Sequence, residues 1–162
     1  MRNVVYLSLG SNLGDREAHL RDAIARLQIA GRVLCVSSFY ETEPVEFRDQ
    51  GWFLNCAGAL ETTKTPEQLI TAILQIEHEM GRQRLQKKGP RIIDIDILLF
   101  SDRIVDLPEL TVPHSAMHQR RFVLEPLAEI APQARHPVLK KTVRELLDAL
   151  PAGQTVRKQQ TK

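Results

Sequence analysis

The chain has 162 residues, the length of one ordinary domain and enough to bury a hydrophobic core. Its composition, 43% hydrophobic and 26% charged, is that of a globular protein, and no apolar run is long enough to cross a bilayer. A formal charge of +2 is too small to indicate a nucleic-acid partner, and the chain does not open with a secretory signal. We therefore expect a single cytoplasmic domain over residues 1–162, monomeric and without membrane or nucleic-acid partners.

The chain up to residue 61 predicts the order strand, helix, strand, strand. Apolar β-branched runs indicate the strands, and core-spaced leucines and isoleucine indicate the helix. The connection 41–52 between the last two strands is long for a hairpin, and such loops often carry function. The predicted elements are strands at 3–10, 32–40 and 53–61 and a helix at 13–30 with Asn12 as its cap.

Phe53 and Asn55 lie on the same face of the strand predicted at 53–61, because alternate strand residues share a face. An aromatic ring beside an amide that both donates and accepts hydrogen bonds suits a flat heterocycle with polar edges. The alternative is structural, since a phenylalanine at a strand end is usually a core residue.

Thr65, Pro66 and Gln68 form a capping box with proline in the first turn, which predicts a helix that Gly81 ends. Glu77 falls on the apolar side of this helix, where a carboxylate needs a partner. Either a basic residue or a ligand donor would satisfy it.

The strand predicted at 92–100 alternates strictly, so that Asp94 and Asp96 share one face and the isoleucines take the other. Two adjacent carboxylates repel and favour a divalent cation between them, and the basic residues upstream exceed what two carboxylates neutralise. Together they indicate a Mg²⁺–triphosphate site, with a half-solvated strand in a surface ion-pair network as the alternative. The upstream basic residues are Arg82, Arg84, Lys87, Lys88 and Arg91.

Beyond residue 100 the pattern predicts a short hairpin arm at 103–105, and the LTVPH segment at 110–114 then places His114 in a loop. Arg120 and Phe122 follow closely, and a histidine with an arginine near a ring is a good phosphate or base contact. Helices are predicted at 122–130 and from a capping box at Thr142 to Leu150, and the polar segment 151–162 is expected to fray.

The two cysteines, Cys35 and Cys56, both fall in apolar strand-like runs. A cysteine in such a run usually behaves as a small buried hydrophobe. We therefore expect both to be buried and neither to form a disulfide.

The order strand, helix, strand, strand, helix, strand predicts an α+β protein with a ferredoxin-like βαββαβ core and a C-terminal helical extension. In this arrangement the two core helices lie on one face of an antiparallel sheet. The fold supports many functions, so the residues of the site must decide between them.

Six segments together resemble the 6-hydroxymethyl-7,8-dihydropterin pyrophosphokinase family of folate biosynthesis, over roughly residues 4–132. GPRIIDIDILLF is the most specific of them. The segments are SLGSNLGD at 8–15, SSFYETEP at 37–44, FLNCA at 53–57, IEHEMGRQR at 76–84, GPRIIDIDILLF at 89–100, and LTVPH with RRFVLEPL within 110–127.

The resemblance implies transfer of the diphosphate of ATP to the hydroxymethyl group of the pterin, which leaves AMP. It implies two Mg²⁺ ions held by Asp94 and Asp96, with Arg82 and Arg91 as the other catalytic residues. The implied pterin-binding residues are Thr42, Pro44, Val45, Phe53, Asn55, Asp94 and Phe122. The implied ATP-binding residues are Glu77, Arg82, Arg84, Lys87, Arg91, Ile97, His114 and Arg120.

The chain departs from the family pattern at three places. Lys87 and Lys88 stand where some members carry arginine and tryptophan in a loop one residue longer, and a lysine offers neither a planar fork nor a stacking ring. Ser115 stands where a tyrosine often follows the histidine, and Phe53 replaces a tyrosine of some members.

Two other functions compete with this one. An RNA-binding module would need aromatic residues in an RNP-like pattern on its central strands, and this pattern is missing. A phosphohydrolase with a DxD nucleophile would carry that motif near its N-terminus and Thr or Val at the position of Leu98.

Overall fold

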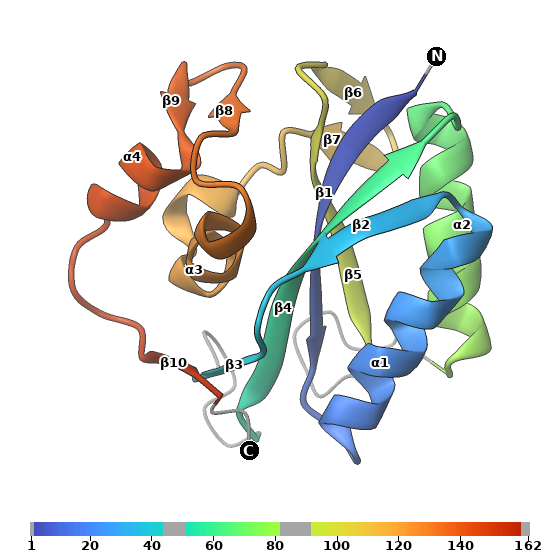
Figure 1. The fold of residues 1–162 in the computed structure, drawn as a ribbon, viewed down its shortest axis with the longest axis horizontal. Helices are drawn as coiled ribbons and strands as arrows, with labels where there is room; N and C mark the ends of the chain where they lie inside the picture. The colour runs from blue at the N-terminus through green and yellow to red at the C-terminus, as the bar shows by residue number, and fades with distance from the viewer. Residues whose placement is uncertain (1, 44–50, 82–91, 160–162) are drawn as a thin grey trace.

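The computed structural model describes residues 2–43, 51–81 and 92–159, which form an α+β structure built on a six-stranded antiparallel sheet (Figure 1). Its strands lie in the order β10-β3-β4-β1-β5, and β2 pairs with β4 on the same side as β3. The strands are β1 (Asn3–Ser11), β2 (Arg32–Val36), β3 (Tyr40–Thr42), β4 (Phe53–Thr62), β5 (Asp94–Phe100) and β10 (Val156–Lys158).

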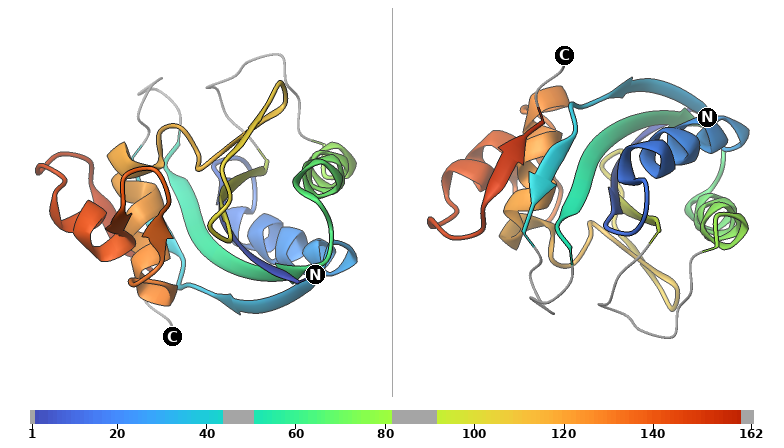
Figure 2. Two further views of the ribbon diagram at one scale, coloured as in Figure 1. Left: turned by 90° about the horizontal axis from the view of Figure 1, so that it is seen from above. Right: turned by 90° about the horizontal axis from the view of Figure 1, so that it is seen from below.

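Helices cover both faces of this sheet (Figure 2). On one face lie α1 (Arg16–Arg26), which continues into the 3₁₀ turn η1 (Leu27–Ile29), and α2 (Pro66–Glu79). On the other lie α3 (Arg121–Ile130) and α4 (Val143–Asp148). The remaining elements are β6 (Val105–Leu107), β7 (Leu110–Val112), η2 (Met117–Gln119), β8 (Arg135–His136) and β9 (Lys141–Thr142). Within the described ranges no helix is long and apolar enough to span a bilayer.

Two hydrophobic cores follow from these layers. The larger core joins α1 and α2 to the sheet, and Ile95 and Ile97 of β5 belong to it. The second core joins α3 and α4 to the opposite face through residues such as Ala57 and Leu98. The predicted C-terminal helical extension therefore packs on the face opposite α1 and α2, and Asp94 and Asp96 lie on that side, half-buried.

The N-terminal caps of the helices were predicted correctly where they depend on local sequence and wrongly where a tertiary contact intervenes. Thr65 and Thr142 form the predicted capping boxes, each bonding the backbone N–H three residues on. The predicted cap of α1 was wrong, because Asp15 takes that position. Asn12 instead donates a hydrogen bond to the carbonyl oxygen of Gly51 (3.2 Å), a contact made across the chain.

The strand predicted at 32–40 is divided into β2 and β3 by residues 37–39. At the break, the Oγ of Ser37 accepts a hydrogen bond from the backbone N–H of Ala57 in β4 (2.9 Å). Glu129 of α3 fixes the start of β3, where it accepts the Ser38 N–H (2.9 Å) and the Tyr40 hydroxyl (2.6 Å). The break thus turns β3 toward α3 while β4 continues as one strand.

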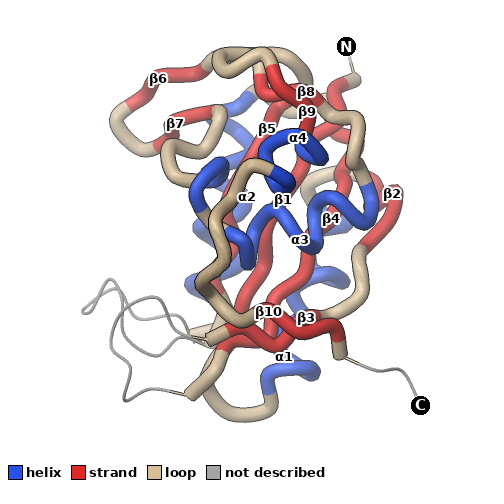
Figure 3. The backbone as a smooth tube through the Cα atoms, turned by 90° about the vertical axis from the view of Figure 1, so that its left-hand side faces the viewer, coloured by secondary structure: helices blue, strands red, loops and turns tan. Residues whose placement is uncertain are grey.

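The segment 151–162 was expected to fray, and this was wrong for its middle part. Val156–Lys158 forms β10, which pairs antiparallel with β3 at the edge of the sheet (Figure 3). A polar segment can add to an edge strand because the backbone hydrogen bonds need no apolar stripe. The side chains of Glu43 and Trp52 also contact this segment, at Thr155 and Arg157.

The predictions for the two cysteines and for the hairpin arm are each confirmed only in part. Cys56 is buried as expected, whereas Cys35 is exposed because β2 buries little of its surface, and neither forms a disulfide. The hairpin arm expected at 103–105 is the pair β6–β7, which begins two residues later.

His136, in the β8–β9 hairpin, gives stability a pH dependence. Its Nδ1 accepts the backbone N–H groups of Val138 (3.3 Å) and Leu139 (3.1 Å), and its ring meets that of His118 edge-on. Burial, and next the neighbouring His118, lowers the pKa of His136 below its usual 6.5. Between the folded and unfolded pKa values the unfolded chain binds more protons, so the free energy of unfolding falls as the pH drops below about 6.5.

We expect His136→Asn to reduce this pH dependence, because the asparagine oxygen can accept the same N–H groups without titrating. Urea unfolding at pH 7.5 and 5.5 measures the effect. Some dependence will remain, since the pKa of His114 is also lowered. His78→Asn on the exposed side of α2 is the control, and an equal change in both variants would contradict the assignment.

Candidate active site

The strand register places the two aspartates in a row of polar side chains across the sheet. Asp94 lies opposite Gly10 of β1, and Gly10 lies opposite Asn55 of β4. Asp96 lies one step further along, opposite Ser8. Residues directly opposite in an antiparallel pair point to the same face, so both carboxylates share a face with Asn55. The alternation predicted for 92–100 is confirmed by the burial of the isoleucines on the other side.

Within this row, Asn55 is buried and fixed by a hydrogen bond. Its Nδ2 donates a hydrogen bond to Oγ1 of Thr42 (2.6 Å), and both residues are buried. A Cβ atom at Gly10 would lie 2.3 Å from Oδ1 of Asn55 and 3.5 Å from the ring of Phe53. Only glycine at position 10 therefore lets the amide lie against β1, and Phe53 stands beside it with part of its surface exposed.

His114 lies near enough to Asp94 and Arg120 to feel the charge of each. Burial is the largest cause that lowers the pKa of His114, and the charge of Arg120 lowers it further, whereas Asp94 acts in the opposite direction. His114 is therefore neutral near pH 7 and lies within electrostatic reach of both residues. Its Nδ1 accepts the N–H of Ala116 (3.2 Å), which leaves Nε2 as the nitrogen that carries a proton.

Phe122 joins the site through Arg120, whose guanidinium carbon lies 5.6 Å from the centre of the Phe122 ring. Phe122 is half-buried at the start of α3 and packs against the second core. The described part of the site therefore contains two carboxylates, a neutral imidazole, a guanidinium, a fixed amide and two aromatic rings. These groups suit a polar planar ligand beside an anionic one.

Glu77 and Ile97 lie on the opposite side of β5 from this row. Glu77 is 3% exposed, and its carboxylate accepts the backbone N–H of Ile95 (2.8 Å). This hydrogen bond gives Glu77 a partner, as its buried position requires. It also ties α2 to β5 at the residue between Asp94 and Asp96. Ile97 is 3% exposed within the larger core, so a nucleotide contact from Ile97 would have to come from its backbone.

Several predicted site residues fall outside the described ranges, and their roles stay predictions. The pterin-site candidates among them follow Glu43 in the connection between β3 and β4. The phosphate-site candidates follow Gly81. The residues are Pro44, Val45, Arg82, Arg84, Lys87 and Arg91.

Arg16 is a residue that sequence reasoning missed. It donates two hydrogen bonds of 2.7 Å to the carboxylate of Glu41 and a third of 3.0 Å to the carbonyl oxygen of Trp52. One side chain therefore holds both ends of the connection between β3 and β4. No local signal could have found it, because its contacts are 25 and 36 residues away. Gly10 was visible as a glycine at the end of a strand, but its role depends on the sheet register.

The chain matches the family model described as 7,8-dihydro-6-hydroxymethylpterin-pyrophosphokinase over residues 6–132. It is 49% identical over 135 residues to a 2-amino-4-hydroxy-6-hydroxymethyldihydropteridine pyrophosphokinase of Bacillus subtilis, covering 82% of this chain and 81% of that protein. A protein of the same name from Methylorubrum extorquens is 44% identical, over 91% of this chain and 94% of its own length.

Larger proteins contain a similar unit. The folic acid synthesis protein fol1 of Schizosaccharomyces pombe is 44% identical over 92% of this chain, which spans 21% of that protein. The crystal structure of Plasmodium falciparum HPPK-DHPS with pteroate superimposes with a TM-score of 0.74 at 18% identity, over 91% of this chain and 42% of that one. The structural likeness supports the fold alone.

Proposed function

This chain belongs to the 7,8-dihydro-6-hydroxymethylpterin-pyrophosphokinase family, and we propose that it transfers the diphosphate of ATP to the hydroxymethyl oxygen of 6-hydroxymethyl-7,8-dihydropterin, with AMP as the second product. The observation that carries the proposal is the row of cross-strand neighbours that places Asn55 and Asp94 on one face of the sheet. The row puts a group suited to a pterin edge beside a group suited to magnesium.

Asp94 and Asp96 are proposed to hold two Mg²⁺ ions. Their carboxylates are hard oxygen ligands on one face, half-buried, and Mg²⁺ is usually bound by one or two carboxylates together with substrate phosphates. Bound Mg²⁺ would neutralise charge on the phosphates during transfer.

The pterin is proposed to lie between the rings of Phe53 and Phe122, with Asn55 and Thr42 at its polar edge. The Oδ1 atom of Asn55 and its remaining N–H present an acceptor and a donor, which is the pattern that a pterin edge requires. Asp94 is proposed to serve both the pterin, at its hydroxymethyl group, and the metal. Pro44 and Val45 are proposed to complete the pocket.

ATP is proposed to occupy the side of the row formed by His114 and Arg120. The neutral imidazole carries its proton on Nε2 and can donate it to a phosphate or base, while Arg120 adds positive charge. Arg82 and Arg91 are proposed as catalytic groups that stabilise the transferring phosphates. Glu77, Arg84, Lys87 and Ile97 are proposed as further ATP contacts.

Four broader predictions stay proposals. We infer a ferredoxin-like core from the order β2-β4-β1-β5, in which all pairs are antiparallel. We infer one domain over 1–162, because β10 joins the C-terminal segment to the central sheet. A cytoplasmic location fits the exposed thiol of Cys35, which suits a reducing compartment. We also infer a monomer.

The decisive experiment mixes the protein with Mg²⁺, ATP and the pterin alcohol and identifies the nucleotide product. We expect AMP in equal amount to the pterin diphosphate, and no reaction without the pterin. ADP would instead indicate an ordinary kinase. A phosphorylated aspartate would indicate the phosphohydrolase, and salt-dependent RNA binding without turnover would indicate the binding module.

A further inference from the structure

Residues 150–158 run from the end of α4 to β10, which pairs with β3 at the edge of the sheet (Figure 1). They lie beyond residue 132, where the match to the family model ends. Their contacts reach three parts of the chain: Arg121 next to Phe122, Glu43 after β3, and Trp52 next to Phe53. Phe122 and Phe53 are the proposed walls of the pterin pocket.

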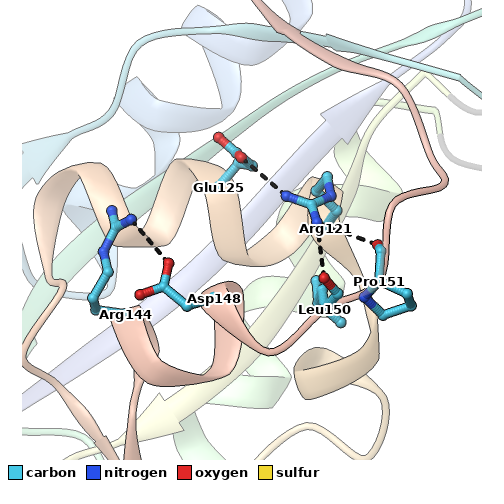
Figure 4. A network of polar contacts seen from close by, with 6 residues as sticks. All are labelled: Arg121, Glu125, Arg144, Asp148, Leu150 and Pro151. Atoms are coloured by element: carbon cyan, nitrogen blue, oxygen red, sulfur yellow. Dashed lines mark hydrogen bonds and ion pairs between the residues drawn. The ribbon is translucent and has the colours of Figure 1, made fainter.

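Arg121 makes the first attachment, at the N-terminus of α3 (Figure 4). Its guanidinium donates long hydrogen bonds to the carbonyl oxygens of Leu150 (3.5 Å) and Pro151 (3.4 Å). It also bonds Glu125 on its own helix at 3.3 Å, which limits the guanidinium to one orientation. The segment is thus anchored one residue from Phe122.

Glu43 makes the second attachment, directly after β3. Its backbone N–H donates to the carbonyl oxygen of Thr155 (3.2 Å), and its carboxylate accepts the N–H of Thr155 (2.7 Å). The side chain of Gln154 donates to the carbonyl oxygen of Glu43 (2.8 Å). Thr42, which holds Asn55, is itself paired with Val156 of β10.

Trp52 makes the third attachment, directly before Phe53. The guanidinium carbon of Arg157 lies 5.0 Å from the centre of the Trp52 ring, a stacked cation–π contact. Arg16 also donates a hydrogen bond to the backbone carbonyl oxygen of Trp52 (3.0 Å). The strand end that carries Phe53 is therefore fixed by residues from both ends of the chain.

We propose that residues 150–158 are a brace that sets the separation of Phe122 and Phe53 and so determines how tightly the enzyme binds its pterin substrate. The inference rests on the proposed function. Arg121 and Arg157 are positioning residues in this account, because each contacts the residue next to a ring. ATP is proposed to bind on the side of His114 and Arg120, and of the three attachments the one at Arg121 is next to Arg120 in the chain.

The test compares Arg157→Ala, Arg121→Ala and the double variant with the wild-type protein. We expect each single change to raise the KM for the pterin about threefold and the double change about tenfold, with the KM for ATP changed less than about twofold by Arg157→Ala. Arg157→Lys should keep part of the effect, because it retains the cation without the planar group. Removal of residues 151–162 should match or exceed the double variant.

Arg144→Ala is the matched control. Arg144 forms a similar ion pair with Asp148 on α4 (3.5 Å), and Figure 4 draws no hydrogen bond or ion pair from it to Leu150 or Pro151. We expect its KM values to equal those of the wild type. Equal increases in both KM values for Arg157→Ala, or an unchanged KM for the pterin in the double variant, would overturn the proposal.

A second measurement separates this proposal from the proposed function. Trp52 is the sole tryptophan of the chain, so its fluorescence reports on the Arg157 contact without turnover. We expect Arg157→Ala to shift the Trp52 emission, and we expect no shift in Arg144→Ala. Absence of AMP in the wild type would refute the proposed function, whereas unchanged Trp52 emission in Arg157→Ala would refute the brace.

Discussion

Replacement of Asp96 by alanine is expected to lower AMP formation by about a thousandfold or more, with the fold intact. Asp96 is half-buried near the start of β5, opposite Ser8, and its carboxylate shares a face with Asp94. Loss of one proposed Mg²⁺ ligand leaves the charge on the transferring phosphates poorly neutralised. Initial rates at saturating ATP, pterin and Mg²⁺ measure the loss, and circular dichroism with thermal unfolding verifies the fold.

Asp106→Ala provides the control for this variant. Asp106 is also a strand aspartate between two apolar residues, but it lies exposed in β6, outside the row of site residues. We expect its rate to stay within about twofold of the wild type, the scatter of a neutral surface change. Retention of full activity in Asp96→Ala, or an equal loss in both variants, would contradict the role of Asp96.

The features that the sequence predicted well depend on near neighbours in the chain. The period of two in β5 places Asp94 and Asp96 on one face whatever the strand pairs with. The capping boxes at Thr65 and Thr142 are each closed within four residues. Such patterns are legible in a single sequence because chain connectivity alone brings their members together.

The features that were missed depend on contacts between distant segments. Arg16 and Glu41 look like ordinary surface charges until the fold aligns α1 with β3. The polar segment around Arg157 lacks a core stripe, yet β3 offers it an unpaired edge. Cys35 sits in an apolar run but on a strand with little covering. In each case a tertiary neighbour outweighed the local pattern.

Replacement of Gly10 by alanine is expected to lower kcat/KM for the pterin by tenfold to about a hundredfold, through Asn55. The new Cβ would lie 2.3 Å from Oδ1 of Asn55, so the amide must move, and this movement would disturb its 2.6 Å hydrogen bond to Thr42. Leaving such a buried group without its partner costs about 1–3 kcal/mol, and the pterin would lose the same polar contact. Steady-state kinetics with the pterin varied at saturating ATP measure the loss.

Gly58→Ala is the matched control for this variant, because Gly58 also lies within the sheet. A Cβ there would meet its nearest atoms at 3.8 and 4.0 Å, an ordinary contact distance. We expect Gly58→Ala to keep the wild-type kcat/KM. Tight pterin binding by Gly10→Ala would show that the position of the Asn55 amide does not govern recognition. A loss shared equally by both glycine variants would place the effect in the sheet rather than in the site.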